Sequence, residues 1–270
     1  MSPDDHPGTA SPPATSDAQP PTAEQERTAE LAETVAELAA GDVDPARRRQ
    51  LVRRVSDAVR VRGVGDLFRP RLAVRWLATA VGEVAPYIPV RDAATLGRHH
   101  DGLTGEQLAE RLIRNAAIAT AGVGAAGGGI AAVEWVVTPA LLSAPVLLAA
   151  ETVAVVAIEM KLIGELHEVY GVPIGGPATH RAVSLLQSWA EQRGVNPMMP
   201  GVGVSAALST AARRELGDRL LRRFGRNLTT LGPVLTGAAV AGFLNRRATK
   251  AMGDRIREDL RHQRPPIGPG

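Results

Sequence analysis

The chain has 270 residues, of which 44% are hydrophobic and 22% charged, with 31 Lys and Arg against 28 Asp and Glu. That length suits one large or two small folded domains, and the balance excludes a chain that is disordered throughout. Cysteine is absent and aromatic residues make up only 3%, which excludes disulfides and cysteine-based zinc sites and disfavours stacking platforms for nucleic-acid bases.

Both ends of the chain lack side chains that a core would bury. Residues 1–22 are mostly Pro, Ser, Thr, Ala and Asp, and residues 263–270 are rich in Pro and Gly. We predict a disordered tail at each end. Because no apolar targeting segment is visible at the N-terminus, we expect a cytoplasmic start.

An Arg-rich helical segment followed by a linker is predicted over residues 23–103. Thr22 precedes Gln25 by three positions, which is the spacing of a capping box, and Asp44 marks the start of a second helix. A third helix is expected over about 69–84.

The stretch 85–103 contains several Pro and Gly residues, so we predict a linker there. It includes the adjacent pair His99 and His100. Two neighbouring histidines can bind a metal ion or respond to pH, but an exposed pair without a role is the simpler interpretation.

Three uncharged apolar tracts stand out in the sequence: residues 116–133, residues 135–150 and residues 228–244. The first is mostly Ala and Gly, and the second is broken by Pro139 and Pro145. The two-residue alternation of strands is not sustained, so we predict an all-α helical bundle whose core helices are rich in Gly and Ala.

A stripe of small residues recurs at four-residue spacing in the first and last tracts. Its members are Thr120, Gly124, Gly128 and Ala132, followed by Gly237 and Ala241. Such a stripe lets two helix backbones approach closely. Glycine inside a helix costs about 1 kcal/mol relative to Ala, so tight packing must offset it. Both a membrane hairpin and the dry centre of a soluble bundle would provide that packing.

The length of the first tract favours association with a membrane over crossing it. Its 18 residues span about 27 Å as a helix, just under a bilayer core of roughly 30 Å. Ala and Gly drive insertion weakly, and Glu134 and Glu151 interrupt the apolar sequence.

Residues 205–226 form a predicted basic amphipathic helix. Its candidate contacts to an anionic lipid surface are Arg213, Arg214, Arg219, Arg222, Arg223 and Arg226. A helix of this kind can lie on anionic lipid. Alternatively it is the solvated face of a bundle helix, with Glu215 and Asp218 paired to arginines. Nucleic acid is not an expected partner, because no recognition fold is visible.

Glu151 and Glu159 are candidate buried carboxylates within apolar sequence. Eight residues apart, they lie roughly 80° apart around a helix. A buried carboxylate needs a partner, and Arg111 or Arg114 of the preceding helix are the candidates. If these are structural ion pairs, removing the Glu151 carboxylate should lower the melting temperature.

Other motifs suggest no catalytic residue, cofactor or metal. Residues 122–127 match G-x-G-x-x-G, but no strand precedes them, as a dinucleotide site requires. No Glu-x-x-His motif of a di-metal bundle occurs. Glu165 and Glu168, on either side of His167, are expected at a solvent-exposed helix end.

Two segments resemble the EcsC family. Residues 159–171 (EMKLIGELHEVYG) are similar to the family's apolar helix that stops at Tyr-Gly, and residues 232–245 (GPVLTGAAVAGFLN) to its later glycine-bearing helix that ends in Asn. The resemblance covers about 104–255, within a predicted core domain of 104–262. It implies a helical, often membrane-associated protein in a cell-envelope setting, and it transfers no catalytic residue.

The sequence therefore predicts a non-enzymatic, membrane-associated structural or interaction protein that docks on or inserts in the cytoplasmic face of the membrane. Anionic lipid is the expected partner, with a membrane protein or a second copy as further candidates and any small-molecule ligand left open. The alternatives are a soluble helical adaptor or regulatory protein, and an enzyme that uses the region of Glu151 and Glu159.

Overall fold

The computed structural model describes much of the chain between Thr22 and Gln263. The described residues are 22–40, 43–63, 65–68, 70–137, 144–193 and 233–263. Every element within them is a helix, which confirms the all-α prediction. The predicted tails lie outside the described residues, except that Thr22 caps the first helix and Gln263 is the last residue of α10 (Pro233–Gln263).

The first two helices begin at the predicted capping residues. Helix α1 spans Ala23–Ala39, and the predicted capping box is present: the Thr22 side chain accepts from the Gln25 backbone at 3.3 Å, and the Gln25 side chain accepts from the Thr22 backbone at 2.8 Å. Helix α2 spans Pro45–Val61, and the Asp44 carboxylate accepts two backbone N–H groups of its first turn. Local capping chemistry sets both starts.

The segment predicted as a linker, 85–103, is partly helical. It contains the 3₁₀ turn η2 (Ala85–Tyr87) and the short helix α4 (Ala93–His99). The Asp92 side chain accepts a hydrogen bond from the backbone N–H of Thr95 at 2.8 Å and so caps α4. A short capped helix thus forms within a stretch whose Pro and Gly residues predicted a linker.

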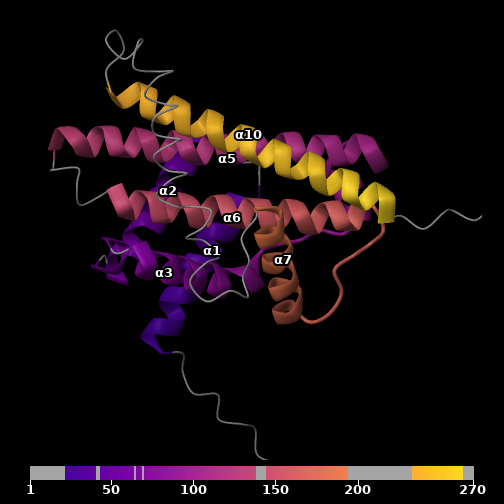
Figure 1. Ribbon diagram of the computed structural model, residues 1–270, viewed down its shortest axis with the longest axis horizontal. Coiled ribbons are helices and arrows are strands. Elements are labelled where there is room, and N and C mark those ends of the chain that lie inside the picture. The colour runs from indigo at the N-terminus through magenta and orange to yellow at the C-terminus, as the bar shows by residue number, and fades with distance from the viewer. Residues whose placement is uncertain are drawn as a thin grey trace, which may run out of the picture.

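Helices α5 (Gly105–Val137) and α6 (Ala144–Val169) form a long antiparallel hairpin (Figure 1). Helix α5 ends at Val137, and Pro145 lies in the first turn of α6, while Pro139 lies outside the described residues. Past the end of α6, Gly171 has a φ of +72°, a conformation that strains residues with a side chain and suits glycine after a helix.

Helix α10 is longer than the sequence predicted. It continues past Asn245, where the apolar tract and the expected helix end, as far as Gln263. The added length buries Met252, Ile256 and Leu260. Their four-residue spacing places them on one face of the helix, so the helix changes from uniformly apolar to amphipathic instead of ending.

Helix α6 lies at the centre of the bundle. Helices α5 and α10 lie to one side of it, and α1 and α3 (Pro70–Val84) lie to the other (Figure 1). Helix α2 contacts both α5 and α6, while α4, α7 (Ala178–Gln192) and the 3₁₀ turn η1 (Gly65–Phe68) also contact α6. A helix surrounded by protein is apolar on every side. This position explains why most apolar side chains of α6 are buried.

The Arg-rich segment shares its core with the long helices. Leu31 and Val35 of α1 and Leu51 and Val55 of α2 are buried in the same hydrophobic cluster as residues of α5, α6 and α10. The predicted domain limit near residue 103 therefore does not separate two cores in the described part of the chain.

Helices α5 and α10 run antiparallel and touch through their glycines. A Cβ built on Gly128 would lie 2.7 Å from the Cβ of Ala238, and one built on Gly124 would lie 2.9 Å from the carbonyl carbon of Ala241. Real Cβ atoms do not approach other atoms so closely. The two backbones can meet because glycine has no side chain at these points.

We expect opposite effects from adding a methyl group at two neighbouring glycines. Gly128→Ala should destabilise the fold by about 1–3 kcal/mol, because the new Cβ overlaps Ala238. Gly129→Ala should stabilise it by up to about 1 kcal/mol through helix propensity, because a Cβ there has nothing within 4 Å. Urea unfolding measures both changes, and effects of the same sign would contradict the packing described.

Candidate functional site

The predicted stripe lies largely along the α5–α10 contact. Besides Gly124, Gly128 and Ala241, Thr120 is fully buried, and its carbonyl oxygen accepts a hydrogen bond from Asn245 Nδ2 at 3.3 Å. Two further members, Ala132 and Gly237, belong to α5 and α10, and their surroundings lie outside the described residues.

Glu159 joins three helices through one carboxylate. It lies on α6 and is 0% exposed. It forms an ion pair with Arg193 at the end of α7, and it accepts hydrogen bonds from Trp189 Nε1 at 2.9 Å and from Thr249 Oγ1 at 2.7 Å. Burial of the charge is therefore compensated by partners on α7 and α10.

The partners predicted for this carboxylate were wrong. Arg114 instead pairs with Glu110 one turn earlier at 2.9 Å on the exposed side of α5, and Arg111 is exposed. Arg193 is 34 positions from Glu159 in the sequence. No local spacing rule relates two residues so far apart.

Glu151 lies on the side of α6 that faces α5. Its carboxylate occupies the space that a side chain on Gly127 would take. It makes no hydrogen bond or ion pair with any residue that the structure describes. Burial raises its pKa from about 4.5 to about 7. The expected ion pair is thus not seen among these residues. Because the buried carboxylate has no partner there, we expect its charge to destabilise the fold, whereas the ion-pair prediction expected it to stabilise the fold.

Glu165, expected at a solvent-exposed helix end, is buried. It pairs with Lys161 one helical turn earlier, and the two residues are 2% and 7% exposed. The i, i+4 spacing was a usable signal for the pair, but only the neighbouring helices determine its burial. Glu168 is half-buried, and its pKa is raised by burial and by the charge of Asp92.

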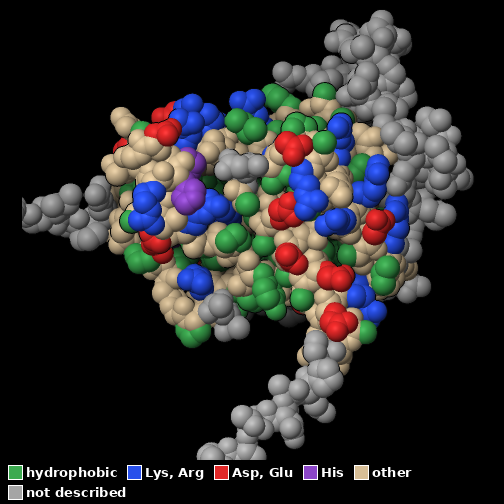
Figure 2. Space-filling view, turned by 180° about the vertical axis from the view of Figure 1, so that it is seen from behind, with side chains coloured by type: hydrophobic (Ala, Val, Ile, Leu, Met, Phe, Trp, Pro, Cys, Tyr) green, Lys and Arg blue, Asp and Glu red, His purple; other side chains and the backbone are tan. Residues whose placement is uncertain are grey.

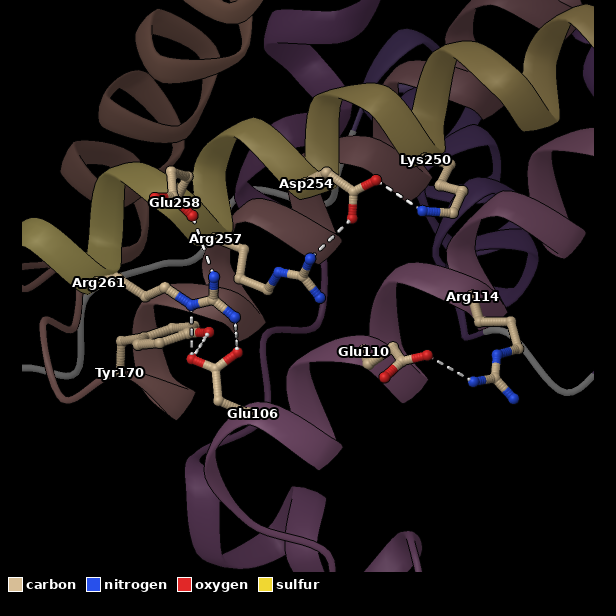
Figure 3. Close-up of polar contacts among 9 residues, drawn as sticks. All are labelled: Glu106, Glu110, Arg114, Tyr170, Lys250, Asp254, Arg257, Glu258 and Arg261. Atoms are coloured by element: carbon tan, nitrogen blue, oxygen red, sulfur yellow. Dashed lines mark hydrogen bonds and ion pairs between the residues drawn. The ribbon is translucent and has the colours of Figure 1, made fainter.

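A second polar cluster lies where α5 begins and α6 ends, and it joins these two helix ends to the end of α10 (Figure 3). Arg261 forks onto the carboxylate of Glu106, with an Nε–Oε1 distance of 2.8 Å, and the Tyr170 hydroxyl donates to the same carboxylate at 2.8 Å. Hydrogen bonding from Arg261 lowers the pKa of Glu106 to about 2, and burial, with this carboxylate, raises the pKa of Tyr170 to about 12. Glu106 lies in the first turn of α5 and Arg261 in the last turn of α10. At these positions each charge also interacts favourably with the dipole of its helix.

Large apolar side chains are exposed on the three long helices. We call the hairpin end the end of the bundle at which α5 ends (Val137), α6 begins (Ala144) and α10 begins (Pro233). In the first turns of α6, Leu148 is 65% exposed, and Phe243 of α10 is 60% exposed. None of the described helices combines the length and the hydropathy needed to cross a bilayer.

The predicted lipid-contacting arginines lie outside the described residues. They are Arg213, Arg214, Arg219, Arg222, Arg223 and Arg226. Among the residues that are described, no three His, Asp or Glu side chains are grouped closely enough to hold a metal ion.

Comparison of the chain with protein-family models, with curated proteins and with solved structures gave no match. The resemblance to the EcsC family thus stays a prediction that depends on the two sequence segments.

We expect Glu159→Gln to destabilise the fold by about 3 kcal/mol, because it leaves the Arg193 guanidinium without its charge partner. Glu258→Gln is the matched control: Glu258 pairs with Arg261 at 3.0 Å but is 58% exposed, so its loss should have little effect. Thermal and urea unfolding compare the two variants. Equally small changes would show that the Glu159 network does not hold the three helices together.

Glu151→Gln should stabilise the protein only at neutral and alkaline pH. Below about pH 4.5 the carboxyl is protonated in both folded and unfolded chains. As the pH rises towards 7, the unfolded chain loses this proton first, so folding loses stability. A shift from 4.5 to about 7 corresponds to ~3 kcal/mol at most. Unfolding at pH 4 and pH 8 tests this, with the exposed Glu110→Gln as control, and a pH-independent effect would contradict it.

Proposed function

We propose that this protein is a non-enzymatic helical scaffold that docks on the anionic cytoplasmic face of a membrane. The observation that carries the proposal is the exposure of Leu148 and Phe243 on the helices that meet at the hairpin end. Large apolar side chains exposed on long helices, beside basic sequence, are what a peripheral lipid-binding protein needs.

The predicted basic amphipathic helix, residues 205–226, comes shortly before α10 in the sequence. In the sequence, Arg226 precedes Pro233, the first residue of α10, by seven positions. A chain of that length spans at most about 25 Å. Attraction between basic residues and anionic lipid amounts to about 1 kcal/mol per residue near the surface, so this stretch would add charge to a contact that starts with apolar side chains.

Docking fits the bundle better than insertion of the α5–α6 hairpin. The side chains that make α6 apolar are buried against other helices of the protein. Transfer of α6 into lipid would break the pairing of Glu159 with Arg193 at the end of α7. An unpaired charge in the bilayer core costs several kcal/mol.

A specific observation also favours the second candidate, a soluble helical adaptor or regulatory protein. The small-residue stripe and the apolar α6 are used in packing within the chain. On the face shown in Figure 2, basic, acidic and apolar side chains are intermixed. A surface of that kind suits a protein in water. We make no enzymatic proposal, because the Glu159 carboxylate is held by Arg193, Trp189 and Thr249.

Flotation of the full-length chain with lipid vesicles distinguishes the two candidates. We expect binding to vesicles of phosphatidylcholine and phosphatidylglycerol, weaker binding at about 500 mM than at about 50 mM salt, and none to phosphatidylcholine alone. The variant Leu148→Ser/Phe243→Ser should bind at least about tenfold more weakly, since one buried apolar side chain contributes ~1.5 kcal/mol or more.

The matched control replaces two other exposed apolar residues. The variant Tyr87→Ser/Val183→Ser changes side chains that are both 55% exposed, on η2 and α7, and should bind as the unchanged chain does. If the chain fails to float with anionic vesicles, the adaptor interpretation replaces the membrane proposal. If both double variants weaken binding equally, the hairpin end is not the contact.

A further inference from the structure

A small polar cavity lies where α4, α5 and α6 meet the end of α1. Its volume is about 40 Å³. The polar residues that line it are Arg91, His99, His100, Asn115, Lys161 and Glu165. The rest of the wall is apolar and includes Leu112, Ala116 and Ile158. His99 is exposed and Arg91 is partly exposed, so these two residues border solvent.

The charges that face the cavity sum to a positive value. Arg91 and Lys161 each contribute +1 and Glu165 contributes −1, which leaves +1 when the histidines are neutral. Arg91 forms no hydrogen bond or ion pair with any residue that the structure describes. Protonation of His99 or His100 would add to the charge. Apolar walls strengthen such a field because they exclude water.

The buried pair of Lys161 and Glu165 is weak evidence of a contribution to stability. Replacing a buried ion pair by apolar residues of similar volume is often neutral or stabilising. α6 is otherwise apolar over most of its length, so apolar residues at both positions would match the rest of the helix. A buried charged pair that lines a cavity beside Arg91, which has no ion-pair partner among the described residues, suits the binding of a small charged ligand.

The cavity volume limits the ligand to a few heavy atoms. At roughly 10–15 Å³ for each water, about 40 Å³ holds about three water molecules. Pockets for nucleotides and other drug-sized ligands measure about 300–1,000 Å³. A tetrahedral oxyanion fits this scale, and its oxygens match the forked donors of a guanidinium.

We propose that this cavity binds a small oxyanion of the phosphate type, with Arg91 as its main ligand and Lys161 and Asn115 as further donors. The anion is either free phosphate or the terminal group of a phosphomonoester whose remainder stays in solvent. Neither case depends on membrane docking, because the cavity is at α4 and not at the hairpin end.

Isothermal titration calorimetry of the full-length chain tests the proposal with two probes, inorganic phosphate and glycerol phosphate. We expect at least one probe to bind. Arg91→Gln should weaken that binding by about tenfold, because it removes one charge-assisted contact. The matched control is Arg98→Gln. Arg98 is an exposed residue of α4 that bonds to Thr95 at 2.9 Å and does not line the cavity, so the control should bind unchanged.

Each outcome supports or overturns the site. Phosphate binding that only Arg91→Gln weakens supports a free anion, and tighter binding of glycerol phosphate with the same dependence supports a phosphomonoester. No binding of either probe at about 20 mM, a concentration well above a millimolar Kd, overturns the proposal. Equal weakening by both variants also overturns it, because binding would then reflect surface charge alone. Circular dichroism and melting of each variant verify that it is folded.

Discussion

The absence of side chains at Gly124 and Gly128 sets the relation between α5 and α10 on which the rest of the bundle depends. Both helices are continuous, α10 over 31 residues, so a contact near the hairpin end determines which residues meet further along. With that register, Thr249 reaches the carboxylate of Glu159, and Arg261 at the far end reaches Glu106. A helix of ordinary side chains at the contact would stand farther away, and these polar bonds would be out of reach.

Enclosure of α6 by other helices has two consequences. Most of its apolar residues face protein, and its buried charged residues must find partners or change their pKa. Glu159 and the pair of Lys161 with Glu165 have partners on α7, α10 or α6 itself. Glu151 has none among the described residues, and its pKa rises. Three of these four charged residues of α6 are therefore paired, and the fourth, Glu151, has a raised pKa.

The two functional proposals concern different parts of the molecule. Lipid docking depends on two side chains that the bundle leaves exposed on α6 and α10, Leu148 and Phe243. Anion binding depends on a cavity between α4 and α6, where Arg91 lies beside the buried pair of Lys161 and Glu165. The glycines and the apolar tracts, which first suggested a membrane hairpin, contribute to neither site directly, because they are used in packing within the chain.

Local chemistry in the sequence determined the all-helical class of the described residues and the starts of α1 and α2 at Thr22 and Asp44. Each of these depends on residues within about four positions of one another, which is the range of helix hydrogen bonds and caps. Only the tertiary structure decided that α10 continues past Asn245, that Arg193 and Thr249 hold Glu159, and that Glu165 is buried. The two partners of Glu159 lie 34 and 90 positions away, so their contact exists only once the helices have packed.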